Sequence, residues 1–237
     1  TDANWSTEEQ AVFLAWAESR QLPRFPASGT DLGGGVDVTY SVVLGDVDGD
    51  GDLDLIAGNE NSTNRLYLNN GDGSFDAGTD LGSETERTVS LVLGDVDRDG
   101  HLDLIVGNLG RNKLYRNNGS GGFDTDIDIG VQTDNTEGLV LGDVDGDGDL
   151  DLIAGNSVQT NKLYLNDGSG NFDAGTDIGS ETDPTLSVVL GDVDGDGDLD
   201  LIAGNVNSTN KLYLNDGSGA FSAGTDVDSE TDFTFSL

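Results

Sequence analysis

One stretch of sequence recurs four times in this chain, and this recurrence limits the fold more than any other feature. The segment Leu-Gly-Asp-Val-Asp begins at Leu44, Leu93, Leu141 and Leu190, with spacings of 49, 48 and 49 residues. Around each copy the text is close to LGDVDGDGDLDLIAGN, followed by NKLYLNDGSG and FDAGTDIGSETD. A fixed period of about 20 to 50 residues is typical of solenoids, propellers and other arrays of one structural unit.

Each period contains four short segments with β-strand character. In the fourth period they cover 187–191, 199–203, 211–215 and 221–227. Asp-Gly-Ser-Gly between the last two is a hairpin turn, and the consecutive apolar residues of DLIAG fit a strand that is covered on both faces. Four strands in about 40–50 residues indicate a propeller blade, whereas a calcium-binding β-roll repeats about every nine residues. We therefore predict an all-β fold, a β-propeller of four-stranded blades.

The predicted organisation is a short N-terminal α-helix followed by the blades. Residues 7–21 have a helical pattern, with Ser6 and Glu9 as a capping box and Pro23 as a stop, and we expect this segment to cap an opening or edge of the propeller. The expected boundaries are 1–24 for the helical segment, 25–237 for the propeller repeats, and 38–83, 87–132, 136–181 and 185–230 for the complete blades.

The two ends of the repeat region resemble parts of a blade. Residues 25–32 resemble a fourth strand, and residues 233–237 resemble a first strand, so the chain holds four complete blades and two halves of a fifth. The halves could share a blade within one chain, or pair between chains to give a homo-oligomer through shared blade strands. A truncated longer array is the third arrangement that the sequence leaves open.

Each repeat also carries an acidic loop of pattern D-x-D-x-D-G-x-x-D between its first two strands. Close carboxylates repel one another by about 1 kcal/mol per pair in water, and Ca²⁺, with its 6–8 oxygen ligands, reverses that sign. Glycine at position six permits the turn around the ion, and position seven would offer its backbone carbonyl. The candidate metal residues are Asp46, Asp48, Asp50, Asp52, Asp54, Asp95, Asp97, Asp99, His101, Asp103, Asp143, Asp145, Asp147, Asp149, Asp151, Asp192, Asp194, Asp196, Asp198 and Asp200.

Calcium is the cation that these loops favour. Mg²⁺ prefers to keep its bound waters. Zinc or copper would need His or Cys ligands, and the chain has one histidine and no cysteine. We expect about four Ca²⁺ ions, one per complete blade, that act as structural braces and not as active centres. Because weak calcium sites suit a calcium-rich exterior, we expect a secreted or cell-surface protein.

The charge balance excludes several classes of partner. Ten Lys and Arg against 46 Asp and Glu give a formal net charge of −36, which argues against a nucleic-acid partner. No run approaches the roughly 18 apolar residues of a membrane span, so we expect no membrane insertion. Catalysis is not expected either, because the only histidine lies in an acidic loop and nearly every acid recurs in each repeat.

The repeats resemble FG-GAP/VCBS repeats, the blade family of the integrin α-subunit propeller and of several fungal and bacterial lectins. The resemblance covers residues 25–237 and is carried by the four acidic loops. It implies calcium loops on the lower rim and ligands on the upper face or between blades. Members often have seven blades, from which this chain's four blades and two halves depart.

Two further sets of residues recur in every repeat. An aromatic beside amides could form a sugar site, but we favour packing between sheets for the tyrosines and turn closure for the asparagines. These residues are Asn59, Asn108, Asn156, Asn205, Tyr67, Tyr115, Tyr164 and Tyr213.

The sequence thus predicts a calcium-stabilised binding or adhesion module for a glycan or protein ligand. A structural repeat segment of a larger surface protein is the alternative. A glycoside-cleaving enzyme is less favoured, because no pair of acids is singled out.

Overall fold

The computed structural model describes residues 32, 37–227, 229 and 234. The chain divides into two units, Thr1–Asp31 and Leu32–Leu237, and the description below concerns the second. The predicted helix over 7–21 lies outside the described residues, and the two predicted half-blade strands lie outside them except for Leu32 and Thr234.

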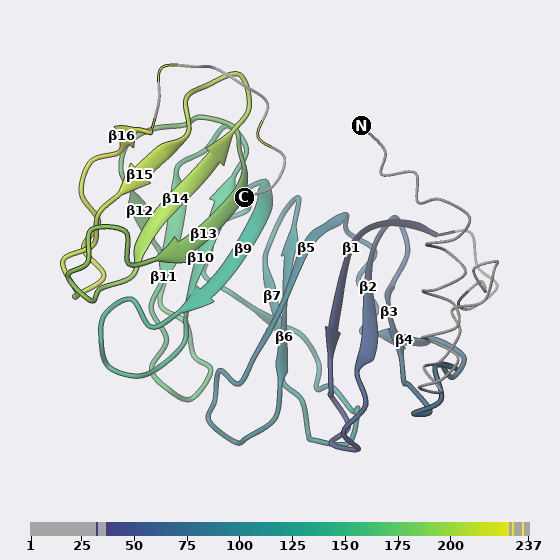
Figure 1. The fold of residues 1–237 in the computed structure, drawn as a ribbon. Helices are drawn as coiled ribbons and strands as arrows, with labels where there is room; N and C mark the ends of the chain where they lie inside the picture. Colours follow the sequence, from purple (N-terminus) through teal and green to yellow (C-terminus); the bar gives the residue numbers. More distant parts are fainter. Residues whose placement is uncertain (1–31, 33–36, 228, 230–233, 235–237) are drawn as a thin grey trace, which may run out of the picture. The chain divides into compact units, whose positions relative to one another are not determined.

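The described residues form four antiparallel four-stranded sheets, one per repeat (Figure 1). This confirms the predicted all-β propeller fold class. The first blade has β1 (Val38–Gly45), β2 (Asp54–Glu60), β3 (Asn64–Tyr67) and β4 (Thr79–Leu81), and the second has β5 (Thr88–Gly94), β6 (Asp103–Asn108), β7 (Lys113–Tyr115) and β8 (Ile127–Asp128). The third has β9 (Thr136–Gly142), β10 (Asp151–Asn156), β11 (Asn161–Tyr164) and β12 (Thr176–Ile178), and the fourth has β13 (Thr185–Gly191), β14 (Asp200–Asn205), β15 (Lys211–Tyr213) and β16 (Thr225–Asp226).

The blades follow one another in chain order through their first strands. β1 contacts β5, β5 contacts β9, and β9 contacts β13. The second strand of each blade also contacts the first strand of the next, as β2 does with β5. Each sheet runs outward from this inner strand to a short outer strand, β4 in the first blade.

The apolar core is divided into three clusters, each between two adjacent blades. In the first cluster, Val47, Ile56, Leu66 and Leu81 of the first blade pack against Leu91, Leu104, Val106 and Tyr115 of the second. The other two clusters repeat this arrangement between blades two and three and between blades three and four. Because the second strands of the two middle blades have a neighbouring sheet on both faces, β6 (DLIVGN) and β10 (DLIAGN) are buried at every residue.

The turn between the second and third strands places a non-glycine residue in the left-handed backbone region in three blades. These residues are Asn61 with φ 57°, Val158 with φ 62° and Asn207 with φ 56°. Asparagine adopts this region readily, whereas a β-branched side chain clashes with the backbone there. Val158 is 62% exposed, so its side chain gains little from packing that would offset the strain.

We expect Val158→Asn to stabilise the protein by about 1 kcal/mol, because asparagine relieves this backbone strain. The matched reverse change, Asn207→Val, should lower the free energy of unfolding by a similar amount. Urea denaturation of both variants beside the unchanged protein measures the two shifts. Equal midpoints for all three proteins would show that the turn does not impose the left-handed conformation.

Candidate metal centre

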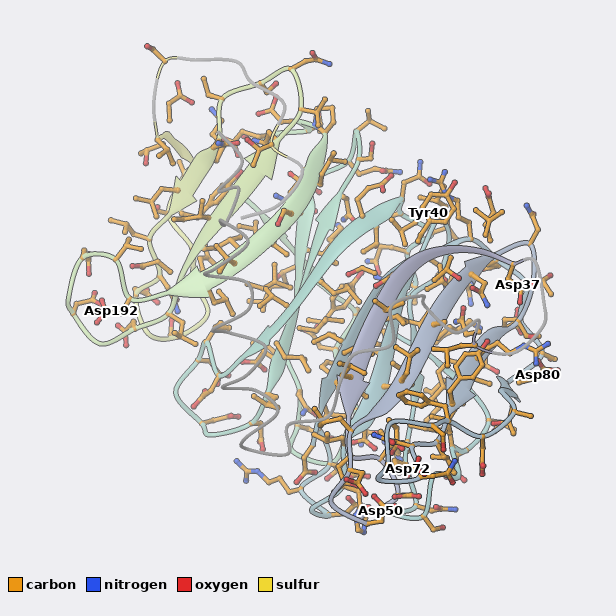
Figure 2. The ribbon with its side chains drawn as sticks, turned by 45° about the vertical axis from the view of Figure 1, so that its right-hand side comes forward. Asp37, Tyr40, Asp50, Asp72, Asp80 and Asp192 are labelled. Carbon is orange, nitrogen blue, oxygen red and sulfur yellow. The ribbon has the colours of Figure 1, made fainter. Side chains whose placement is uncertain are left out.

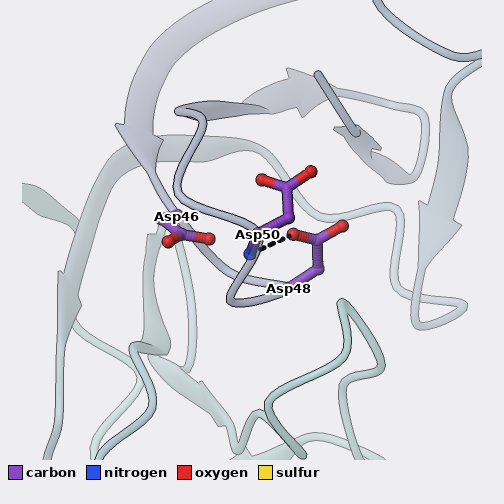
Figure 3. Close-up of side chains that lie close together, drawn as sticks. All are labelled: Asp46, Asp48 and Asp50. Atoms are coloured by element: carbon purple, nitrogen blue, oxygen red, sulfur yellow. Dashed lines mark hydrogen bonds between the residues drawn. The ribbon is translucent and has the colours of Figure 1, made fainter. Parts of the chain in front are cut away.

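The acidic loops lie where the first strand of each blade ends. Figure 2 shows Asp50 beyond the end of β1 and Asp192 beyond the end of β13. In the first loop, ligand atoms of Asp46, Asp48 and Asp50 lie within 4.8 Å of one another (Figure 3). Gly51 has φ +94°, the left-handed conformation that the expected turn at position six requires.

The loop is folded by its own carboxylates. Asp46 accepts hydrogen bonds from the Gly49 N–H at 2.8 Å and from the Gly51 N–H at 3.0 Å. The Asp50 N–H donates to Asp48 Oδ1 at 3.2 Å, which is the dashed line in Figure 3. The same bonds recur in the third and fourth loops. These acids are therefore held together by local backbone geometry.

The ninth-position aspartate has a further role that the sequence pattern did not reveal. Asp103 is fully buried, and its two oxygens accept bonds from the Val96 N–H at 3.1 Å and the Asn117 N–H at 2.8 Å. Its counterparts in the other loops accept the same pair of backbone bonds. Burial raises the pKa of Asp103 and of Asp151 to about 6 each. This carboxylate ties the loop to the end of the third strand.

The structure brings together three acids per loop, but the set differs between loops. In the first two loops the grouped acids are those at positions one, three and five, and in the last two they are those at positions one, three and nine. The groups are Asp46, Asp48 and Asp50; Asp95, Asp97 and Asp99; Asp143, Asp145 and Asp151; and Asp192, Asp194 and Asp200.

The side chain at position seven lies against the hairpin between the third and fourth strands of its own blade. A Cβ atom on Gly71 would lie 2.5 Å from Asp52 Oδ2, and one on Gly119 would lie 2.3 Å from the His101 ring. The backbone carbonyl of position seven as a metal ligand stays a prediction.

The donor set fits a hard divalent cation. It consists of carboxylate oxygens, the ligands that calcium takes. Asp95 Oδ1 is out of solvent contact and has no hydrogen-bond partner among the described residues, so it is an unmatched acceptor in the second loop. Burial and the neighbouring carboxylates raise the pKa of Asp48 and of Asp145, so the negative charges in these loops lack compensation.

The recurring tyrosines and asparagines are structural, as the sequence favoured. Tyr115, Tyr164 and Tyr213 are at most 2% exposed. Asn156 accepts a hydrogen bond from Thr136 Oγ1 at 2.9 Å and donates to the carbonyl of Thr160 at 2.8 Å, which closes the turn after β10. Both observations agree with the packing and turn roles that the sequence favoured over a sugar site.

We expect Asp151→Asn to destabilise the protein by about 1–3 kcal/mol in the presence of chelator, because an amide NH₂ would face a buried backbone donor. Asp147→Asn is the matched control in the same loop. Asp147 is exposed, and an amide oxygen can still accept its bond from the Asp149 N–H, so the expected change is within about 0.5 kcal/mol. Because the chelator removes bound cations, the comparison reports only on the hydrogen bonds that Asp151 accepts from backbone N–H groups. Equal stabilities of the two variants would contradict the anchoring of the loop by Asp151.

Comparison with known proteins gives a family match and a fold match. A family model described as FG-GAP-like repeat matches residues 46–106, 95–154, 143–203 and 192–236. A comparison with curated proteins finds no match. Among the residues described, there is no helix with the length and apolar character of a membrane span.

Two solved structures show the similarity of fold. An Agrocybe aegerita lectin that recognises non-reducing terminal N-acetylglucosamine is 22% identical, with a TM-score of 0.59 over 82% of this chain and 54% of the lectin. BBS1N in complex with ARL6DN is 13% identical, with a TM-score of 0.55 over 87% of this chain and 58% of that one. The chain thus spans little more than half the length of either structure.

Proposed function

The chain belongs to the FG-GAP-like repeat family, and from this premise we propose that it is a calcium-stabilised, extracellular binding or adhesion module. The observation that carries the proposal is the group of three aspartates in each of four repeats, with ligand atoms within 4.8 Å. One such group could arise by chance on an acidic surface, but its recurrence in the same loop of four repeats supports a common ligand.

In this proposal the chain's own residues prepare the calcium site. The first-position aspartate and its two backbone N–H partners fix the turn, and the third- and fifth-position or ninth-position carboxylates point to the same centre. Bound calcium would supply the positive charge that offsets their repulsion. Four divalent ions would also change the formal net charge of −36 by +8, to −28. The binding free energy would then add to the stability of the folded chain.

A glycan or protein ligand would bind at the opposite ends of the strands. There the turns between second and third strands present hydroxyl and carboxylate groups, such as Thr209 Oγ1 donating to Asp226 Oδ1 at 2.6 Å. Ser208 donates to Asp183 of the preceding connection at 2.7 Å, so two loops form one polar surface. The lectin with a similar fold supports a glycan as the first ligand to test.

We propose that this module does not catalyse a reaction. His101, the only histidine of the chain, lies in the second acidic loop against the hairpin of its own blade. The polar groups elsewhere recur from blade to blade, so no pair of carboxylates stands out as a glycoside-cleaving site. The alternative to a binding module is a structural repeat segment of a larger surface protein.

We expect Ca²⁺ to raise the melting temperature of the chelated protein, because an ion at 100 times its dissociation constant adds about 2.7 kcal/mol per site. Titration calorimetry should give four ions per chain, and Mg²⁺ at the same concentration should have a smaller effect. Asp48→Ala should remove one ion and part of the temperature shift. Asp76→Ala, an exposed change outside the loops, should retain all four ions.

The control separates loss of a site from loss of fold. A melting temperature that does not respond to Ca²⁺ would refute the calcium proposal. An equal response from the Asp48 and Asp76 variants would also count against the first acidic loop as a site.

We expect the calcium-loaded protein to bind at least one glycan in an array that includes oligosaccharides ending in N-acetylglucosamine. Competition by the corresponding free sugar should abolish this binding. If every glycan fails while the calcium response is intact, the glycan part of the proposal is wrong and the structural alternative gains support.

A further inference from the structure

Among the described residues, the first blade has no blade before it and the fourth blade has none after it. Each apolar cluster joins one face of a blade to the opposite face of the next blade, so four blades give three clusters. On the fourth blade, the residues equivalent to Val47, Ile56, Leu66 and Leu81 are Val193, Ile202, Leu212 and Val227. On the first blade, the residues equivalent to Leu91, Leu104, Val106 and Tyr115 are Val42, Leu55, Ala57 and Tyr67. Val42, Val193 and Val227 are 62%, 48% and 53% exposed, whereas Ala57 and Tyr67 are buried. By their positions, the two sets correspond to the two halves of a fourth cluster.

A close approach at one glycine shows how specific the fit between blades is. A Cβ on Gly45, Gly94 or Gly142 would lie 2.5–2.6 Å from the Cδ1 atom of a leucine in the next blade. At the equivalent Gly191 there is nothing within 4 Å. The leucine that would fill this space has its counterpart in Leu44 of the first blade, which is 55% exposed.

A set of hydrogen bonds recurs at each interface between adjacent blades and is incomplete at the two ends of the described array. The carbonyl of Val144 accepts bonds from Asn215 Nδ2 at 2.7 Å and from the Gly219 N–H at 3.0 Å of the next blade. The carbonyls of the equivalent valines in the first and second blades accept the same two bonds. In the described part of the chain, the equivalent Val193 carbonyl has no such donor. The equivalent Gly73 N–H of the first blade has no acceptor there.

We propose that the free face of the fourth blade binds the free face of the first blade in a second copy of this chain. The contact would continue an interface that the chain already makes three times, with an apolar cluster, a glycine that admits a leucine, and a valine carbonyl that accepts two bonds. Such a head-to-tail contact is heterologous and closes into a ring when the rotation per copy permits. Each copy contributes four blades, so two copies would give an assembly of two times four blades. This number lies within the usual range of about 4–8 blades for a propeller.

A pair of introduced cysteines tests this contact directly, because the chain contains no cysteine. Across the internal interfaces, a Cβ on Gly121 would lie 3.4 Å from Asp48 Cβ, and one on Gly219 would lie 3.7 Å from Asp145 Cβ. These distances are close to the roughly 3.5–4.5 Å that a disulfide needs. The equivalent pair for the proposed contact is Gly73→Cys with Asp194→Cys.

Asp48→Cys with Gly121→Cys is the matched control for the internal interface. It makes the same two exchanges at equivalent positions and should form a bridge within one chain. The oxidation is carried out in 0.5 M salt, which screens the repulsion between two chains of net charge −36. We expect the test pair to give covalent species at multiples of 24.6 kDa on a non-reducing gel. The single-cysteine variants show the background of random oxidation.

Each outcome of the cross-linking experiment decides the proposal. A bridge between chains, above that background, supports it. A bridge of the test pair within one chain would show that the four blades close on themselves, and this result overturns it. A bridged control beside an unbridged test pair would show that the two faces do not meet, and it too overturns the proposal.

A second experiment uses the chain without cysteines. Sedimentation equilibrium should give a mass above 24.6 kDa, and Val42→Asp, which charges the free face of the first blade, should return the mass to that of one chain. Val131→Asp alters a residue that is also exposed but lies on the connection after β8, and it should leave the mass unchanged. A monomeric unchanged chain at micromolar concentration would refute the proposal.

Discussion

Apolar packing between neighbouring sheets is the interaction on which this structure depends. No blade has an interior of its own, since every cluster takes its residues from two adjacent blades. Stability therefore approximates a sum over interfaces, as in other repeat proteins. The consecutive apolar residues of β6 (DLIVGN) and β10 (DLIAGN) suit this arrangement, because these strands are covered on both faces in the middle of the array.

The acidic loops and this packing are physically linked. In the first three loops the second residue is a valine whose side chain belongs to an apolar cluster, as Val96 does. Its N–H donates to the buried Asp103, and its carbonyl accepts bonds from the hairpin of the next blade. Whatever fixes the loop therefore also positions a contact between blades. Calcium bound in the loop would strengthen both, which gives a physical reason for a brace at this point of every repeat.

The sequence predicted the blades because the repeat period and the turn residues are local features. It also predicted the acids that lie together at positions one and three, because a short loop keeps alternate residues close. The role of Asp103 as an acceptor of two backbone bonds could not be predicted, since one donor, Asn117, is 14 residues away. The two sets of grouped acids also depend on side-chain orientation, which differs between loops with nearly the same sequence.

The basic residues of the second blade acquire a meaning only in the folded chain. Arg98 pairs with Asp149 of the third blade at 2.6 Å, and Arg116 donates to the carbonyl of Ser169 in that blade at 2.8 Å. Both lie at an interface where two acidic loops come close, so they offset the repulsion between them. The position of Arg98 is occupied by glycine in the other three loops, including Gly195 of the fourth. A contact made through the fourth blade would have no such arginine, so its stability would depend more strongly on salt and on bound cations.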